Sequence, residues 1–158
     1  MIFILKKFTV GATTNFFGEF IARKLFNHIE NNEEENFKIS VYISAIIAGG
    51  FYNLIAYRIS SRLARVALIV GLTRSLIDVI DRMMGGSGLN QETYAEDFIY
   101  DTIIVYYIFL IITRILEMIQ KKSEEKKFDQ AIISGLPLSI AVNTYYNYRY
   151  REELTNPR

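Results

Sequence analysis

ISVYISAIIAGGFYNLIAY, residues 39–57, is nineteen residues long and carries no formal charge. Three arginines, Arg58, Arg62 and Arg65, follow it within eight positions. A helix needs about 20 mostly apolar residues to cross ~30 Å of hydrocarbon at ~1.5 Å per residue. The stretch meets that length marginally, so it predicts either a helix that crosses a lipid bilayer or a fully buried helix in a soluble bundle. We favour the bilayer.

Four further helical stretches are predicted around this one, at residues 2–29, 59–84, 94–120 and 130–148. The last of them is again nineteen residues without a charge. Gly135 and Pro137 lie in its first half and predict a kink, because proline removes one backbone hydrogen bond and clashes with the preceding turn. We therefore expect an all-α fold of about five helices. It would form a single domain over residues 1–158, a multi-helix membrane bundle with a kinked last helix.

Small residues in the central stretch indicate close helix packing. Ala45, Gly49 and Gly50 have the spacing that lets two helix backbones approach each other. Polar groups within otherwise apolar helices join neighbouring helices when water is absent. The predicted helix-packing and interaction residues are therefore Ala45, Gly49, Gly50, Asn53, Gly135, Pro137 and Asn143.

One acid and one base lie deep within the predicted helix at 59–84. Arg74 and Asp78 are four residues apart, and Arg82 follows Asp78 by four more, so the two arginines flank the carboxylate on one side of the helix. In lipid such charges face the protein interior, where they join helices or line a path. We predict an intramembrane charge pair between Arg74 and Asp78. A structural role is favoured because the two charges satisfy each other.

Basic residues alternate between the connections of the five predicted helices. Residues 1–7, 58–65 and 114–129 together hold ten Lys or Arg. The connections at 28–38 and 85–101 hold one lysine among several acids. In membrane proteins, short loops rich in Lys and Arg stay on the cytoplasmic side. The alternation predicts an integral, multi-pass protein with the basic loops 58–65 and 114–129 on the cytoplasmic or an equivalent side.

Catalytic and ligand-binding motifs are not recognisable. The chain has no cysteine, which excludes disulfides, thiolate metal sites and a cysteine nucleophile. His28 is the only histidine, and nothing near it in the sequence supplies a nucleophile. The acidic run at 33–35 lacks the ligand order of an EF-hand, and no P-loop or dinucleotide-binding motif is present. A net charge of +1 gives no case for a nucleic-acid surface. We predict no enzyme activity, no cofactor and no metal.

The order of certain elements is similar to that of EcsC-type bacterial proteins. The residues concerned are RSLIDVI at 74–80, the glycine break and acidic helix that follow, and GLP at 135–137 with Asn143 six positions after the proline. This similarity is one of pattern, and no residue role or activity is carried over from it.

The predicted partners are a lipid bilayer and other membrane helices, with no nucleic acid. We expect a non-catalytic membrane protein that acts through helix–helix contacts, as a subunit or an assembly or scaffold factor of a larger membrane complex, or as a homo-oligomer. Two alternatives stay open. One is a pore or carrier with Arg74 and Asp78 on the pathway, and the other is a soluble helical bundle that acts as an adaptor or an unrecognised enzyme.

Overall fold

The computed structural model describes residues 1–30, 39–120 and 129–155. Within these ranges the chain forms five α-helices and one short 3-10 helix, and no strand. They are α1 (Ile2–Glu30), α2 (Ile39–Ile55), η1 (Ala56–Arg58), α3 (Arg62–Met83), α4 (Tyr94–Gln120) and α5 (Asp129–Thr155). The predicted all-α fold of five helices is confirmed.

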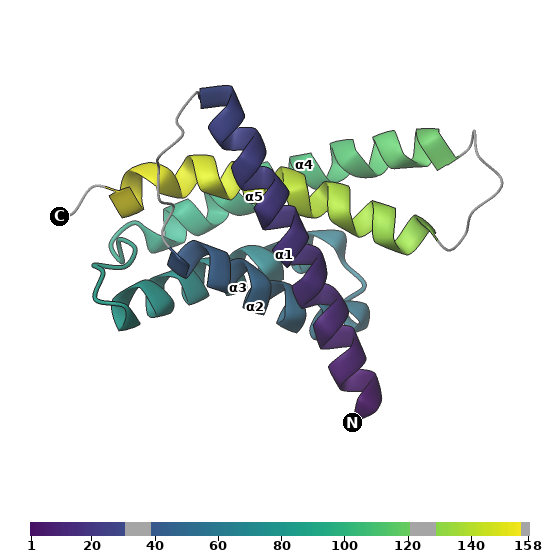
Figure 1. Cartoon of the computed structure of the whole chain (residues 1–158), viewed down its shortest axis with the longest axis horizontal. Helices are drawn as coiled ribbons and strands as arrows, with labels where there is room; N and C mark the ends of the chain where they lie inside the picture. The colour runs from purple at the N-terminus through teal and green to yellow at the C-terminus, as the bar shows by residue number, and fades with distance from the viewer. Residues whose placement is uncertain (31–38, 121–128, 156–158) are drawn as a thin grey trace.

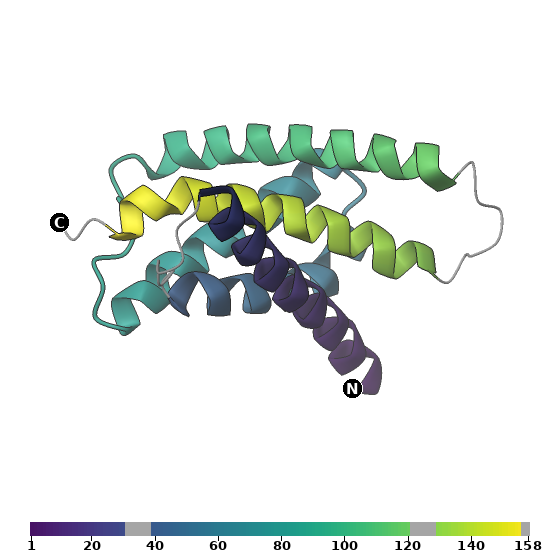
Figure 2. The ribbon, with the colours of Figure 1, turned by 45° about the horizontal axis from the view of Figure 1, so that its top comes forward.

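The helices are arranged as two layers with one helix across them. Figures 1 and 2 show α4 and α5 running alongside each other, with α2 and α3 beneath them and α1 crossing obliquely. Along the chain α2 packs on α3, α3 on α4, and α4 on α5, while α1 packs on both α2 and α5. The α1 helix therefore ties the early part of the chain to its last helix.

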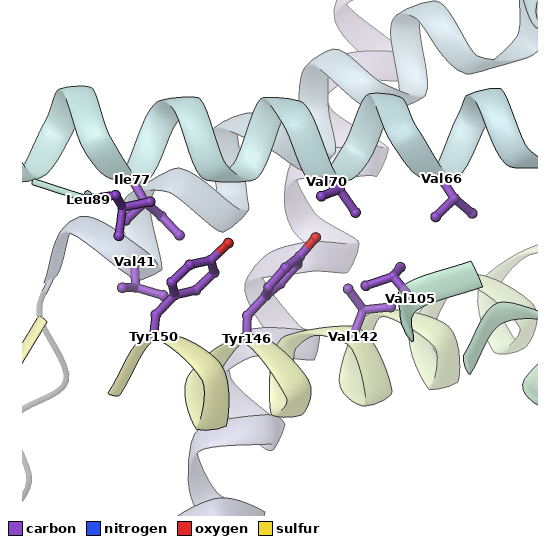
Figure 3. Packing of buried hydrophobic residues seen from close by; sticks show 9 residues of the cluster. All are labelled: Val41, Val66, Val70, Ile77, Leu89, Val105, Val142, Tyr146 and Tyr150. Carbon is purple, nitrogen blue, oxygen red and sulfur yellow. The ribbon is translucent and has the colours of Figure 1, made fainter. Parts of the chain in front are cut away.

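The hydrophobic core lies mainly between α3 and α5. Figure 3 shows Tyr146 and Tyr150 projecting from α5 toward α3, with small aliphatic side chains around them. The buried cluster consists of Val41, Val66, Val70, Ile77, Leu89, Val105, Val142, Tyr146 and Tyr150. It contains no large aliphatic side chain from the outer face of α4, so that face takes no part in the core.

Local signals set the limits of α3. Ser61 precedes the helix with an extended backbone, and its side-chain oxygen accepts a hydrogen bond from Ala64 N at 3.3 Å, as an N-cap does. After the helix the chain turns through Gly85 and Gly88, whose φ angles of +86° and +70° favour glycine. The predicted helix at 59–84 therefore starts later than expected, because η1 and a short extended segment separate it from α2.

Within the described parts of the chain, two helices are long and apolar enough to cross a membrane: α2 extended through η1 (Ile39–Arg58), and α4 (Tyr94–Ile119). The core helix of a soluble protein passes the same test, so the expected multi-helix membrane bundle is supported only to this extent. The α5 helix is not one of the two. Its predicted run has no charge, but Ser, Asn, Thr and Tyr make it much less apolar than α4. It continues as one helix through Pro137, and the predicted kink stays a prediction.

Candidate functional site

The α1 helix meets α2 at glycines, with almost no space between the backbones. A Cβ atom added at Gly49 would lie 2.6 Å from Gly11 O, and one added at Gly11 would overlap Gly49 O. Two amides fix the crossing: Asn15 Nδ2 donates to Ala45 O at 2.8 Å, and Asn53 Nδ2 donates to Lys7 O at 2.5 Å. Only glycine allows this approach, and the two half-buried amides donate to carbonyl oxygens across it.

A chain of polar side chains continues this contact onto α5. Ser139 Oγ donates to Asn15 Oδ1 at 2.6 Å, and Asn143 Nδ2 donates to Ser139 Oγ at 3.0 Å. An added Cβ at Gly135 would lie 3.5 Å from Thr14 Cγ2, which is ordinary contact. Asn15 of α1 is therefore bonded to both α2 and α5.

These contacts place four predicted interaction residues against α1 of the same chain: Ala45, Gly49 and Asn53 at the α2 crossing, and Gly135 on α5. A fifth, Asn143, bonds Ser139 of its own helix, which in turn bonds Asn15 of α1. A Cβ added at Gly50 would meet the ring of Phe8, also on α1. The small-residue face of α2 is buried by this packing. It is therefore covered within the chain and offers no free surface to a partner while α1 is docked.

A buried charge cluster lies between α3, α4 and α5. Arg74 is fully buried, and it donates to Asp97 at 3.1 Å and to Asp101 at 3.4 Å. Arg149 of α5 donates to Asp97 at 2.9 Å and lies 3.5 Å from Asp101. Two cations and two carboxylates thus compensate one another, which offsets part of the cost of burying their charges. Arg74 and Asp101 are fully buried, whereas the side chains of Asp97 and Arg149 are 15% and 30% exposed.

Two tyrosine hydroxyls also donate hydrogen bonds to Asp101. Tyr145 donates to one carboxylate oxygen at 2.6 Å, and Tyr150 donates to the other at 2.9 Å. Burial, followed by the hydrogen bond to Asp101 and its charge, raises the pKa of Tyr145. Burial, followed by the charge of Asp101, also raises the pKa of Tyr150. Both phenols therefore stay protonated and act as donors.

Asp78, the predicted partner of Arg74, has other bonded partners in the structure. It accepts from Arg82 at 3.0 Å, from Leu89 N at 2.8 Å and from Gln91 Nε2 at 2.9 Å. The carboxylates that accept from Arg74 belong to α4. Arg74 and Asp78 therefore serve two separate structures, an interhelical cluster and the turn that follows α3.

Sequence reasoning missed a second buried acid, Glu19 on α1. Arg23 donates to its Oε1 at 2.9 Å, and Asn147 Nδ2 of α5 does so at 3.1 Å. Burial raises the pKa of Glu19, while the bonds from Arg23 and Asn147 lower it. The sequence shows Glu19 and Arg23 as an i, i+4 pair, but nothing in it indicates that the acid is covered by α5.

The outward face of α4 is apolar and uncovered. Only 11% of the 18-residue apolar stretch within its candidate span is buried, against 44% for the corresponding stretch of α2. The exposed large side chains on α4 are Ile99, Tyr100, Ile103, Tyr107, Ile111, Ile115, Met118 and Ile119. An apolar surface of this length is unusual for a monomer in water.

A cavity of about 200 Å³ lies among the five helices. Its walls combine apolar side chains such as Val105 and Leu138 with polar groups from Asn53, Thr73 and Asn143. Among the residues that the structure describes, no group of three or more His, Cys, Asp or Glu is placed to hold a metal ion. Tyr146 of α5 lines the cavity and stacks on Tyr150 of the charge cluster, with ring centres 5.7 Å apart. The cavity and the charge cluster are therefore adjacent.

Comparison with known proteins finds no protein-family model, no curated protein and no solved structure that matches this chain. The similarity to EcsC-type proteins thus stays a similarity of pattern.

Proposed function

We propose that this chain is a non-catalytic helical membrane protein that acts through helix–helix contacts, as a subunit or assembly factor of a membrane complex. The observation that carries the proposal is the outward face of α4, a candidate span of 26 residues that contains an 18-residue apolar stretch only 11% buried. At ~1.5 Å per residue such a helix covers ~39 Å, enough to cross the hydrocarbon layer with some tilt. Acyl chains are the surroundings that this surface suits best.

The distribution of polar groups supports the same proposal. Arg74 and Asp101 are fully buried and bonded to each other, while Ile103, Tyr107 and Ile111 of the same region of α4 are exposed. Membrane proteins place ionisable groups toward the protein interior and apolar side chains toward lipid. A soluble bundle favours the opposite arrangement along an exposed helix.

Membrane extraction tests this proposal. The chain should stay in the membrane pellet after carbonate treatment and should need detergent to remain monodisperse. Because there is no native cysteine, single cysteines at positions 34, 60, 90 and 124 then report sidedness. If α3 crosses as well, as the alternation of basic connections predicts, 34 and 90 react from one face of the membrane, and 60 and 124 from the other. If only the two candidate spans α2 and α4 cross, 60 and 90 share a face. A chain that is monodisperse in plain buffer contradicts the proposal.

A carrier is the second candidate function, and the internal cavity favours it. A cavity of about 200 Å³, whose mainly apolar walls carry several polar groups, is large enough for a small solute. In reconstituted liposomes a carrier would show a solute flux that falls when Arg74 or Asp78 is replaced by alanine. An unchanged flux in both variants rules out a pathway through these residues.

A further inference from the structure

Five basic residues lie on three segments that the packing of α1 on α2 brings close to one another. They come from the start of α1, from η1 and from the start of α3, and we call them the basic end: Lys6, Lys7, Arg58, Arg62 and Arg65. The lysines of α1 precede the arginines by more than 50 residues in the chain, so only the fold brings the two groups together.

Contacts with Tyr57 hold the basic end in place. The Lys7 ammonium lies 3.5 Å from the centre of the Tyr57 ring, and Arg58 Nε donates to the Tyr57 hydroxyl at 2.8 Å. The bond from Asn53 to Lys7 O fixes the start of α1 against the end of α2. The cations from α1 and η1 are thus neighbours across one tyrosine.

No carboxylate neutralises the basic end. None of its five side chains forms an ion pair with an acid in the described parts of the chain. Residues 1–18 and 39–77 contain no Asp or Glu at all. By contrast, each of the other arginines whose side chain is described bonds a carboxylate, namely Arg23, Arg74, Arg82, Arg114 and Arg149. Like charges gathered without counter-charges repel each other, so this end favours an anionic partner.

Exposed apolar side chains adjoin these cations. Residues 2–5 at the start of α1 are all exposed, as are Tyr57 and Leu63. A free phosphate ion would gain nothing from such neighbours. A lipid surface offers both chemistries, since acyl chains accept the apolar residues while the phosphates take the cations.

We propose that the basic end binds the phosphate groups of anionic phospholipids. The choice of lipid as the source of the phosphate rests on the membrane function proposed above. The planar guanidinium groups of Arg58 and Arg62 suit phosphate oxygens, with which they form paired hydrogen bonds. Each cation near an anionic lipid surface strengthens binding about fivefold.

Short-chain lipids test the proposal without a bilayer. The purified chain in uncharged maltoside micelles is titrated calorimetrically with dihexanoyl phosphatidylglycerol, dihexanoyl phosphatidylcholine and inorganic phosphate. We expect saturable binding of phosphatidylglycerol at least tenfold tighter than that of the other two probes. Replacing two cations of the basic end, in K6Q/R62Q, should weaken that binding roughly thirtyfold.

The matched control is K24Q/R82Q, which removes the same charge from the other ends of α1 and α3. It should leave phosphatidylglycerol binding within about twofold of the unmodified chain. Equal binding of both lipids, an unchanged affinity in K6Q/R62Q, or an equal loss in the control overturns the proposal. If inorganic phosphate binds as tightly as phosphatidylglycerol, the proposal that the bound phosphate group belongs to a lipid is wrong. If the chain is monodisperse without detergent, the membrane function fails, and the same titration in plain buffer still decides whether the basic end selects the anionic lipid.

Discussion

The two faces of α4 differ in chemical character. The inner face carries Asp97 and Asp101, which receive hydrogen bonds from two arginines and two tyrosines of α3 and α5. The outer face carries large apolar side chains, among them Ile103, Tyr107 and Ile111, that touch no other helix closely enough to be buried. The acids of this inner face therefore point toward the protein and the large apolar side chains toward the surroundings, while the exposed charges Glu96, Arg114 and Glu117 lie near the two ends of the helix.

This difference indicates whether water or lipid surrounds the outer face of the helix. In water a surface helix buries its apolar stripe and exposes its charges. In lipid the preference reverses, because exposing an uncompensated charge to acyl chains costs free energy, whereas exposing an apolar side chain to them does not. The paired charges inside and the uncovered isoleucines outside agree with the second case. Four substitutions test the comparison.

Removing Asp101 should have the largest effect. In D101L the buried Arg74 loses one of its carboxylates, and Tyr145 and Tyr150 lose their acceptor, so we expect a loss of about 3–5 kcal/mol in unfolding free energy. Denaturant titration followed by circular dichroism measures it. The double variant R74L/D101L should recover much of this loss, because an apolar pair replaces the charges. Strictly additive losses would show that the two residues act independently.

A charge on the outer face should be costly in lipid and harmless in water. For I111K we expect about 2.5–3.5 kcal/mol against membrane insertion, if residue 111 lies near the bilayer centre. The measurement is the fraction of chain that resists carbonate extraction, with I111L as the control. A soluble bundle predicts the opposite result, since an exposed substitution changes stability by less than about 0.5 kcal/mol and improves solubility.

The α1–α2 crossing should tolerate no added methyl group. In G11A the new Cβ overlaps Gly49 O, so the helices must separate, at a cost of about 1–3 kcal/mol. The control is G135A, whose Cβ would lie 3.5 Å from Thr14 Cγ2. There we expect no loss, or a gain of up to ~1 kcal/mol from helix propensity. Equal effects of the two changes in thermal unfolding would show that the crossing is not tight.

The ion pair between Arg114 and Glu117 should matter least. Its nitrogen and oxygen are 3.4 Å apart, and both side chains are largely exposed near the end of α4. Solvent screens such pairs, so E117Q should change the unfolding free energy by less than about 0.5 kcal/mol. If E117Q lowered the unfolding free energy by nearly as much as D101L, burial would not explain the difference between the exposed Arg114–Glu117 pair and the cluster around Asp101.

The helices themselves could be predicted from the sequence. The stretch predicted at 94–120 coincides with α4, and that at 2–29 with α1 to within one residue. The first and last residues of these helices follow from where uncharged runs give way to charged connections. Such changes in composition can be read from the local sequence. The predicted run at 130–148 understates α5, because the charged residues after it continue the helix.

The partners of charged residues could not be predicted in the same way. Local spacing pairs Arg74 with Asp78 at i+4, but the structure bonds Arg74 to α4, and that choice depends on how three helices pack. A signal was present nonetheless. Asp97 and Asp101 are spaced i, i+4, as are Tyr145 and Arg149, so each pair lies on one helical face. The importance of Gly11 was missed as well, because close packing needs the identity of the second helix.

Spin labelling along α4 tests most directly whether its outer face lies in lipid. A nitroxide is attached to I111C, and to S87C as the exposed loop control, in the reconstituted chain, and its collisions with oxygen and with a water-soluble nickel chelate are measured. Oxygen concentrates in lipid, and the chelate stays in water. We predict frequent oxygen collisions and few nickel collisions at position 111, with the reverse at position 87. Frequent nickel collisions at position 111 would place this face in water and contradict the account.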